Sequence, residues 1–124
     1  MRFLVLRAYL SLILFDLYLA RGNFQALYKK VRQYPVEKRL AADYGMEVVC
    51  DAVDMASIWY WKHVLCLQRS AATACLLRKH GIPAQMVIGV QQTPFKAHAW
   101  VEVGGQVVND KPYTPEMYSI VERC

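Results

Sequence analysis

The sequence predicts an α+β fold, in which N-terminal helices pack on a small antiparallel β-sheet. Apolar residues recur at helical spacing over much of the first 80 residues, whereas after Gly81 they follow the pattern of strands. Gly104 and Gly105 then separate two short runs, as in a β-hairpin. Helices followed by antiparallel strands, rather than alternating with them, are typical of the α+β class.

Length and composition predict one folded domain over residues 1–124. Of its 124 residues, 56% are hydrophobic, which is enough apolar surface for a single core. We expect a helical part over residues 1–60 and a helix and sheet over residues 61–124. The net charge of +5 could attract an acidic peptide. The basic residues are scattered without a nucleic-acid-binding motif, which argues against a nucleic-acid partner.

Residues 1–20 are predicted to form a helix that is apolar nearly all round. Arg7 and Asp16 interrupt the apolar run, so the stretch between them is too short for a membrane span. Asp16 also lies inside what would be the apolar part of a signal peptide. Protein should therefore cover this helix. It either packs into the core, or part of it docks a partner protein or touches a membrane surface peripherally.

Two further helices are expected before residue 61. Residues 23–34 read as a more polar helix or linker that ends at Pro35. Residues 36–60 have helical periodicity, which includes Leu40 and Tyr44, and Gly45 is the weak point of this helix.

The clearest helix is predicted over residues 67–80. Leu67, Ala71 and Ala74 recur on one face, and Gly81 is suited to the C-terminal cap. Cys66 then lies at the helix N-terminus. Free amide groups and the helix dipole favour a thiolate there, so we expect the pKa of this thiol to be lowered.

The strands are predicted from the residues that follow this helix. Residues 82–90 read as a buried strand, residues 91–96 as a loop, and residues 97–103 as an alternating strand. Residues 106–110 return beside the last of these and complete a hairpin.

Cys66, His98 and Asp110 occur in the order of a thiol nucleophile, a base and an acid that orients the base. The hairpin register decides whether the last two can meet. A two-residue turn at Gly104 and Gly105 would put His98 and Asp110 on opposite faces of the sheet, and the triad would fail. A three-residue loop that begins one residue earlier would pair them, with Gly105 left-handed. We therefore expect the longer loop.

Several ordered motifs match one family pattern. They are CLQRS at residues 66–70, LLRKHGIPA at 76–84, VIGV at 87–90, PFKAHAWVEV at 94–103 and VND at 108–110. These motifs closely resemble the leader peptidases of lasso peptide biosynthesis, which are transglutaminase-like cysteine proteases with a papain-like core. The detailed match covers about residues 61–110, and the apolar N-terminal region agrees in character only.

The resemblance implies a catalytic role for the helix and sheet. Cys66 would attack a peptide carbonyl, His98 would carry the thiol proton to the leaving amine, and Asp110 would orient the imidazole. The implied substrate is a ribosomally made precursor, cut between leader and core before a separate lasso cyclase closes the macrolactam. A separate leader-recognition protein is the expected partner, because 124 residues leave no room for a fused recognition domain. No cofactor is implied.

Four other residues have weaker assignments. Arg69, in the first helical turn, either pairs with an acid, helps to position substrate, or is solvated. Trp100 either walls the thiol site or packs across the strands. His63 is a rival base, and Glu102 is expected on the hairpin surface. The backbone N–H of Cys66 is the expected oxyanion donor.

The four cysteines indicate a reducing cytoplasm rather than a disulfide framework. Cys50 and Cys75 lie in helical apolar patterns and read as small buried hydrophobes. A zinc site formed by His63, Cys66, Cys75 and His80 is an alternative, although this spacing matches no compact zinc module.

Two other functions stay open. An acyltransferase on the same scaffold would use an amine in place of water. A domain without activity would only bind a peptide or scaffold the cyclase. The presence of Cys66, His98 and Asp110 together favours an enzyme.

Overall fold

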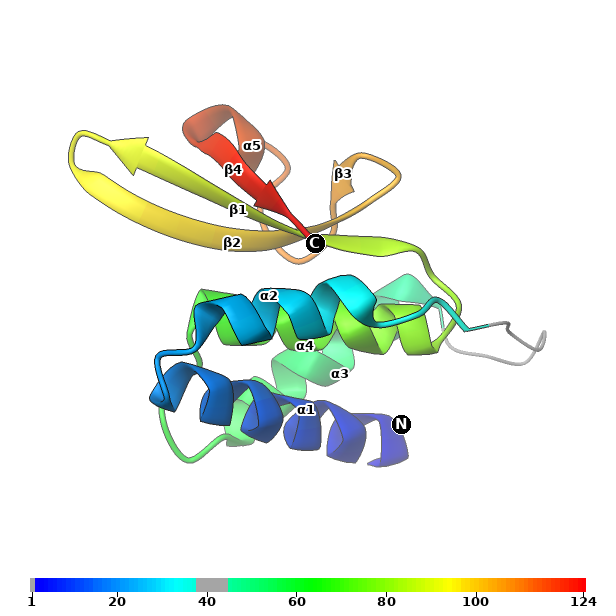
Figure 1. Ribbon diagram of the computed structural model, residues 1–124. Coiled ribbons are helices and arrows are strands. Elements are labelled where there is room, and N and C mark those ends of the chain that lie inside the picture. The colour runs from blue at the N-terminus through cyan, green and yellow to red at the C-terminus, as the bar shows by residue number, and fades with distance from the viewer. Residues whose placement is uncertain (1, 38–44) are drawn as a thin grey trace.

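A computed structural model describes residues 2–37 and 45–124, and in it four helices form a layer beneath a four-stranded antiparallel sheet (Figure 1). The sheet has the order β3-β2-β1-β4. The predicted α+β class is therefore confirmed. The elements are α1 Arg2–Ala20, α2 Phe24–Gln33, α3 Met46–Trp59, α4 Cys66–Lys79, β1 Ala84–Gln92, β2 Phe95–Val103, β3 Gln106–Val107, α5 Thr114–Met117 and β4 Ser119–Arg123.

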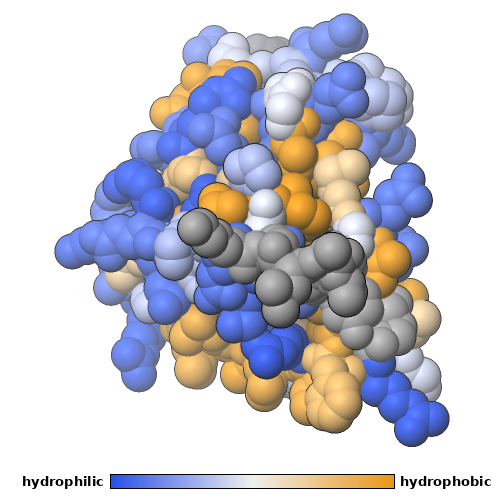
Figure 2. Space-filling model, turned by 90° about the vertical axis from the view of Figure 1, so that its right-hand side faces the viewer, coloured by the Kyte–Doolittle hydropathy of each residue, from blue (hydrophilic) through white to orange (hydrophobic). Residues whose placement is uncertain are grey.

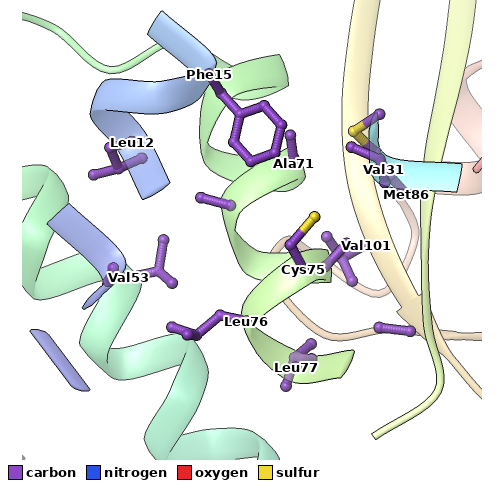
Figure 3. Packing of buried hydrophobic residues seen from close by; sticks show 14 of the residues in the cluster. Leu12, Phe15, Val31, Val53, Ala71, Cys75, Leu76, Leu77, Met86 and Val101 are labelled. Atoms are coloured by element: carbon purple, nitrogen blue, oxygen red, sulfur yellow. The ribbon is translucent and has the colours of Figure 1, made fainter. Parts of the chain in front are cut away.

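The helix α4 is the centre of the core. Its side chains are buried almost continuously from Ser70 to Arg78, because α1 and α3 cover one side and β1 and β2 the other. Figure 3 shows Cys75 of α4 between Leu12 of α1 and Met86 of β1. Each large side chain buried in this way contributes about 1.5–3 kcal/mol. Packing on both sides therefore holds α4 in place from Ser70 to Arg78.

The predicted end of α4 is confirmed at Gly81. This glycine has φ of 79°, in the left-handed region where a side chain would be strained. Its N–H donates to the Arg78 carbonyl at 3.0 Å, and the Ile82 N–H donates to the Leu77 carbonyl at 2.9 Å. These two bonds form a Schellman motif, which satisfies carbonyls at the helix end.

The helix expected over residues 36–60 is shorter than predicted. Its structured part is α3, which begins at Met46 directly after Gly45. The Glu37 N–H donates to the Arg78 carbonyl at 2.9 Å, which holds the residues after Pro35 in a non-helical connection to α4. The predicted positions Leu40 and Tyr44 lie outside the described residues.

The loop predicted over residues 91–96 is wrong, because β1 and β2 run on to a two-residue turn. Gln92 pairs with Phe95 across this turn. Residues 92–97 are all exposed, so neither face of the hairpin tip has to be apolar. The alternation of apolar and polar residues that marks a half-buried strand is therefore missing here.

The expected three-residue loop between β2 and β3 is also wrong. Gly104 and Gly105 have φ of 59° and 80° and close a two-residue turn of the kind that two left-handed residues favour. Glu102 consequently pairs with Val107. The strand β3 ends at that residue and does not continue to residue 110.

One face of α1 belongs to the core and the other is exposed. Leu4, Ala8, Leu12 and Phe15 are buried. The exposed face carries Phe3, Leu6, Leu10, Ile13, Leu14 and Leu17. Figure 2 shows hydrophobic atoms along the lower edge of the molecule, where α1 lies in Figure 1. Of the described helices, only α1 is long and apolar enough to cross a membrane, judged by length and composition alone.

Candidate active site

Cys66 is the first residue of α4, and its side chain is partly buried. The preceding Leu65 has an extended backbone, and its N–H donates to the Gln68 side-chain oxygen at 3.4 Å. The Gln68 amide nitrogen in turn donates to the Leu12 carbonyl of α1 at 2.8 Å. Since Gln68 is fully buried, this side chain anchors the start of α4 to α1. The backbone N–H groups of the first turn have no partner within the helix.

His98 and Asp110 form a direct hydrogen bond. The distance from His98 Nε2 to Asp110 Oδ2 is 2.5 Å, and both side chains are mostly buried. Partial burial acts to raise the pKa of Asp110, but hydrogen bonds from His98 and from the Lys111 N–H outweigh it and lower this pKa overall. The nearby positive charge of Arg69 acts in the same direction. Because Asp110 occupies Nε2, the other ring nitrogen, Nδ1, is left to act on a further group.

His98 and Asp110 form this hydrogen bond although the turn between β2 and β3 has two residues, the length that was expected to put them on opposite faces of the sheet. The Val108 N–H still donates to the Val101 carbonyl at 2.9 Å, but the Val101 N–H donates at 2.7 Å to the side-chain oxygen of Asn109. The side chain of Asn109 thus takes the place of a backbone acceptor, and the chain leaves the sheet. Asp110 then reaches His98 from a bend and not from a strand.

Asn109 also attaches this bend to the first turns of α4. Its side-chain amide nitrogen donates to Ser70 Oγ at 3.2 Å, and its backbone carbonyl accepts from the Arg69 guanidinium at 3.2 Å. Arg69 and Ser70 follow Cys66 by three and four residues, so they are its neighbours on one helix face. No role for Asn109 was predicted from the sequence. A polar residue at the end of a hairpin strand was the only signal for it.

Aromatic side chains enclose the imidazole. The Tyr118 ring stacks on His98 with a centroid distance of 5.4 Å, and the Trp100 ring lies 6.1 Å away. Trp100 is fully buried, so it packs behind the histidine. The alternative that Trp100 walls the thiol site and contacts substrate stays a prediction. Tyr118 was missed in the sequence because it follows a segment with no clear periodicity.

Glu102 is not a surface acid, contrary to the prediction. Its side chain is only 6% exposed. One carboxylate oxygen accepts from Trp100 Nε1 at 2.8 Å, and the other accepts from Arg123 at 3.0 Å. Arg123 of β4 thus compensates the charge of this buried carboxylate.

Arg69 has the acidic neighbour that its position in the first turn suggested. Its guanidinium lies 3.9 Å from Asp54 of α3, a long ion pair, in addition to its bond to Asn109. A role of Arg69 in positioning substrate stays a prediction. His63, the rival base, is exposed, whereas the Asp110 carboxylate is bound to His98.

Open cavities lie beside both parts of the site. One of about 500 Å³ is lined by residues of α3, by residues of the segment before Cys66, including Tyr60 and His63, and by Arg69 of α4. Another of about 190 Å³ is lined by His98, Asp110 and residues of the chain around α5. A peptide therefore has access to the surface near Cys66 and to the surface near the His98–Asp110 pair.

The residues of the alternative zinc site are dispersed in the structure. Cys75 lies in the core, nine residues along α4 from Cys66, while His63 is exposed. Within residues 2–37 and 45–124, no three His, Cys, Asp or Glu side chains are grouped closely enough to hold a metal ion.

Helices on an antiparallel sheet, with a cysteine at a helix start, a histidine on a strand and an aspartate beside it, are the features of a transglutaminase-like protein. The chain belongs to the transglutaminase-like superfamily, whose family model matches residues 9–123. It is also similar to the microcin J25-processing protein McjB of Escherichia coli, with 46% identity over 56 residues. That segment is 45% of this chain but only 27% of McjB. No solved structure shows a significant match to the chain.

Proposed function

We propose that this protein is a cytoplasmic cysteine peptidase that removes the leader from a ribosomally made lasso peptide precursor. A separate leader-recognition protein would present the precursor, and a cyclase would then close the macrolactam. The observation that carries the proposal is the His98–Asp110 hydrogen bond of 2.5 Å in a segment bound to the face of α4 that begins at Cys66. The similarity to a microcin-processing protein supports the choice of substrate class.

In the proposed first step, His98 Nδ1 takes the proton of the Cys66 thiol while the sulfur attacks the carbonyl carbon of the scissile bond. Backbone N–H groups at the start of α4 stabilise the resulting oxyanion. The C–N bond then breaks, and His98 returns the proton to the leaving amine. The leader remains as a thioester on Cys66, and the core peptide leaves with a free N-terminal amine.

In the second step, water gives a proton to His98 and attacks the thioester carbon. The C–S bond breaks, the leader leaves as a carboxylic acid, and the proton returns to the sulfur. Asp110 holds the imidazole and stabilises its charged form in both steps. The free amine on the core is the group that a macrolactam-forming cyclase requires.

The test mixes the protein with precursor and recognition protein and follows the peptide masses. We expect Cys66→Ala to lower the rate of leader release by more than about 10³-fold, because the nucleophile is lost. Cys50→Ala is the matched control, since Cys50 is also a partly buried helix cysteine. Leader release by Cys66→Ala at the normal rate would refute the assignment. Transfer of the leader to an added amine in preference to water would indicate an acyltransferase.

A further inference from the structure

A groove lies at the other end of α4 from Cys66. Residues spaced by three and four along α1, from Arg7 to Phe15, form one wall, and Lys30 and Tyr34 at the end of α2 form the other. The floor is the last part of α4, from Cys75 to Lys79. At 1.5 Å per residue, this floor is about 14–20 Å from Cys66 along the helix. The groove is therefore distinct from the candidate active site.

The groove has an apolar floor and a basic rim. Burial raises the pKa of Cys75 to about 12 and also raises the pKa of Tyr34, so both groups are neutral at physiological pH. Arg7 and Lys30 contribute two positive charges to the rim, and among the described residues no carboxylate lines the groove. The C-terminal ends of α2 and α4 each offset about half a charge. A net charge of about +1 thus remains on the lining of the groove, beside an apolar surface.

The groove continues into the exposed apolar face of α1. Leu10 and Leu14 line the groove and are also part of that face. The cavity volume of about 230 Å³ exceeds the roughly 150 Å³ that can hold a benzene molecule. It can therefore accept one or two aliphatic side chains. A flat bilayer surface could touch the face of α1 but could not fill this concave site.

We propose that this groove is a docking site for an amphipathic helix of another protein, with leucine-like side chains on one face and carboxylates along its edge. Apolar anchors would fill the cavity, and the carboxylates would meet Arg7 and Lys30. A second copy of this chain is a poor occupant, because its own exposed helix α1 is flanked by arginines. The acid on α1, Asp16, is bound to Lys62 at 2.7 Å and to Tyr60 at 2.8 Å. This docking site is independent of the proposed peptidase activity.

The probe is a labelled synthetic helix of about four turns, with Leu at positions i, i+3, i+4 and i+7 and Glu along both edges. Fluorescence anisotropy measures its binding to the full chain. We expect the Glu peptide to bind about ten-fold or more tightly than the same peptide with Lys in place of Glu, and the difference to shrink at high salt. Equal affinity for the two peptides would overturn the proposal.

Matched variants locate the binding. Leu10 and Leu6 are 56% and 55% exposed on the same helix, but only Leu10 lines the groove. We expect Leu10→Ala to weaken binding of the Glu peptide about ten-fold and Leu6→Ala to have little effect. Arg7→Glu should weaken binding similarly, whereas Arg2→Glu, at an exposed position outside the groove, should not. Thermal unfolding followed by circular dichroism confirms that each variant is folded.

Three results would contradict the docking site. Equal losses for the Leu10 and Leu6 variants would show general adhesion to the face of α1. Binding to anionic lipid vesicles, without binding of the Glu peptide, would assign this face to a membrane surface. Dimerisation in analytical ultracentrifugation that Leu10→Ala abolishes, again without peptide binding, would assign it to a second copy of the chain.

Discussion

The bond between His98 and Asp110 determines which imidazole nitrogen is basic. Asp110 accepts from Nε2, so the proton is held there and the lone pair is on Nδ1. The lowered pKa of Asp110 keeps its carboxylate charged at neutral pH, despite partial burial. The same charge stabilises the imidazolium that forms after the histidine takes a proton.

We expect Asp110→Asn to lower peptidase activity by about 10²–10⁴-fold, since the asparagine amide can neither hold the His98 tautomer nor stabilise the imidazolium. A carboxyl with a lowered pKa in the folded state stabilises the protein above its unfolded pKa of about 3.9, and this contribution is lost as the pH falls below that value. Urea unfolding between pH 3 and 7 should therefore show a smaller acid-induced loss of stability in the variant. Asp51→Asn, at an exposed position on α3, is the control.

The central strand β1 is shaped to hold the histidine. Gly89 of β1 is paired with His98 of β2 on one side and with Ile120 of β4 on the other. A Cβ atom at Gly89 would lie 2.7 Å from Tyr118 Cβ and 2.8 Å from a ring carbon of Trp100. Both of these residues contact the His98 ring. The missing side chain of Gly89 thus makes room for the aromatic groups around the imidazole.

For this element, we predict that Gly89→Ala displaces Tyr118 or Trp100 and destabilises the protein by about 1–3 kcal/mol. The rate of leader release should also fall under conditions in which the variant is fully folded, because His98 loses its packing. Gly45→Ala is the matched control, since among the described residues no atom beyond its chain neighbours lies within 4 Å of its added Cβ. Urea unfolding and a peptidase assay well below the unfolding temperature measure the two effects. A variant with wild-type activity would contradict this role for Gly89.

Across the whole molecule, one buried arginine connects the layers. The Arg78 guanidinium on α4 donates to the carbonyls of Ala84 at 2.8 Å, of Cys124 at 2.6 Å and of Tyr34 at 3.3 Å. It also donates to the Val31 carbonyl of α2. These acceptors belong to the ends of α2, β1 and β4, so one side chain satisfies backbone groups from three parts of the chain.

We expect Arg78→Met to lower the free energy of unfolding by about 3 kcal/mol, because several buried carbonyls lose their donor. Arg32→Met removes the ion pair with Glu122 of 3.2 Å, in which both side chains are substantially exposed, and should cost less than about 1 kcal/mol. Chemical denaturation followed by circular dichroism compares the two variants. Similar losses would show that Arg78 does not have the connecting role described here.

The features that depend on near neighbours could be predicted from the sequence. The helix that starts at Cys66 and its end at Gly81 follow from helix periodicity and from the left-handed preference of glycine. No individual helix or strand was predicted after residue 110, where the structure has α5 and β4. The strand β4 lies at the sheet edge and is largely exposed, so its pattern is weak and its pairing with β1 is long-range.

By itself, the sequence determined the α+β class, the position of Cys66 at a helix start and the identity of a His and an Asp suited to thiol chemistry. Only the tertiary structure decided that His98 and Asp110 meet. Turn chemistry predicts a register from the residues of the turn, but it cannot tell where a strand leaves its sheet. That point depends on the Asn109 side chain, which replaces a backbone acceptor for Val101 and also binds Ser70 of α4. The contact with Ser70 joins residues 39 positions apart in the sequence, so it exists only once the helix and the sheet have packed together.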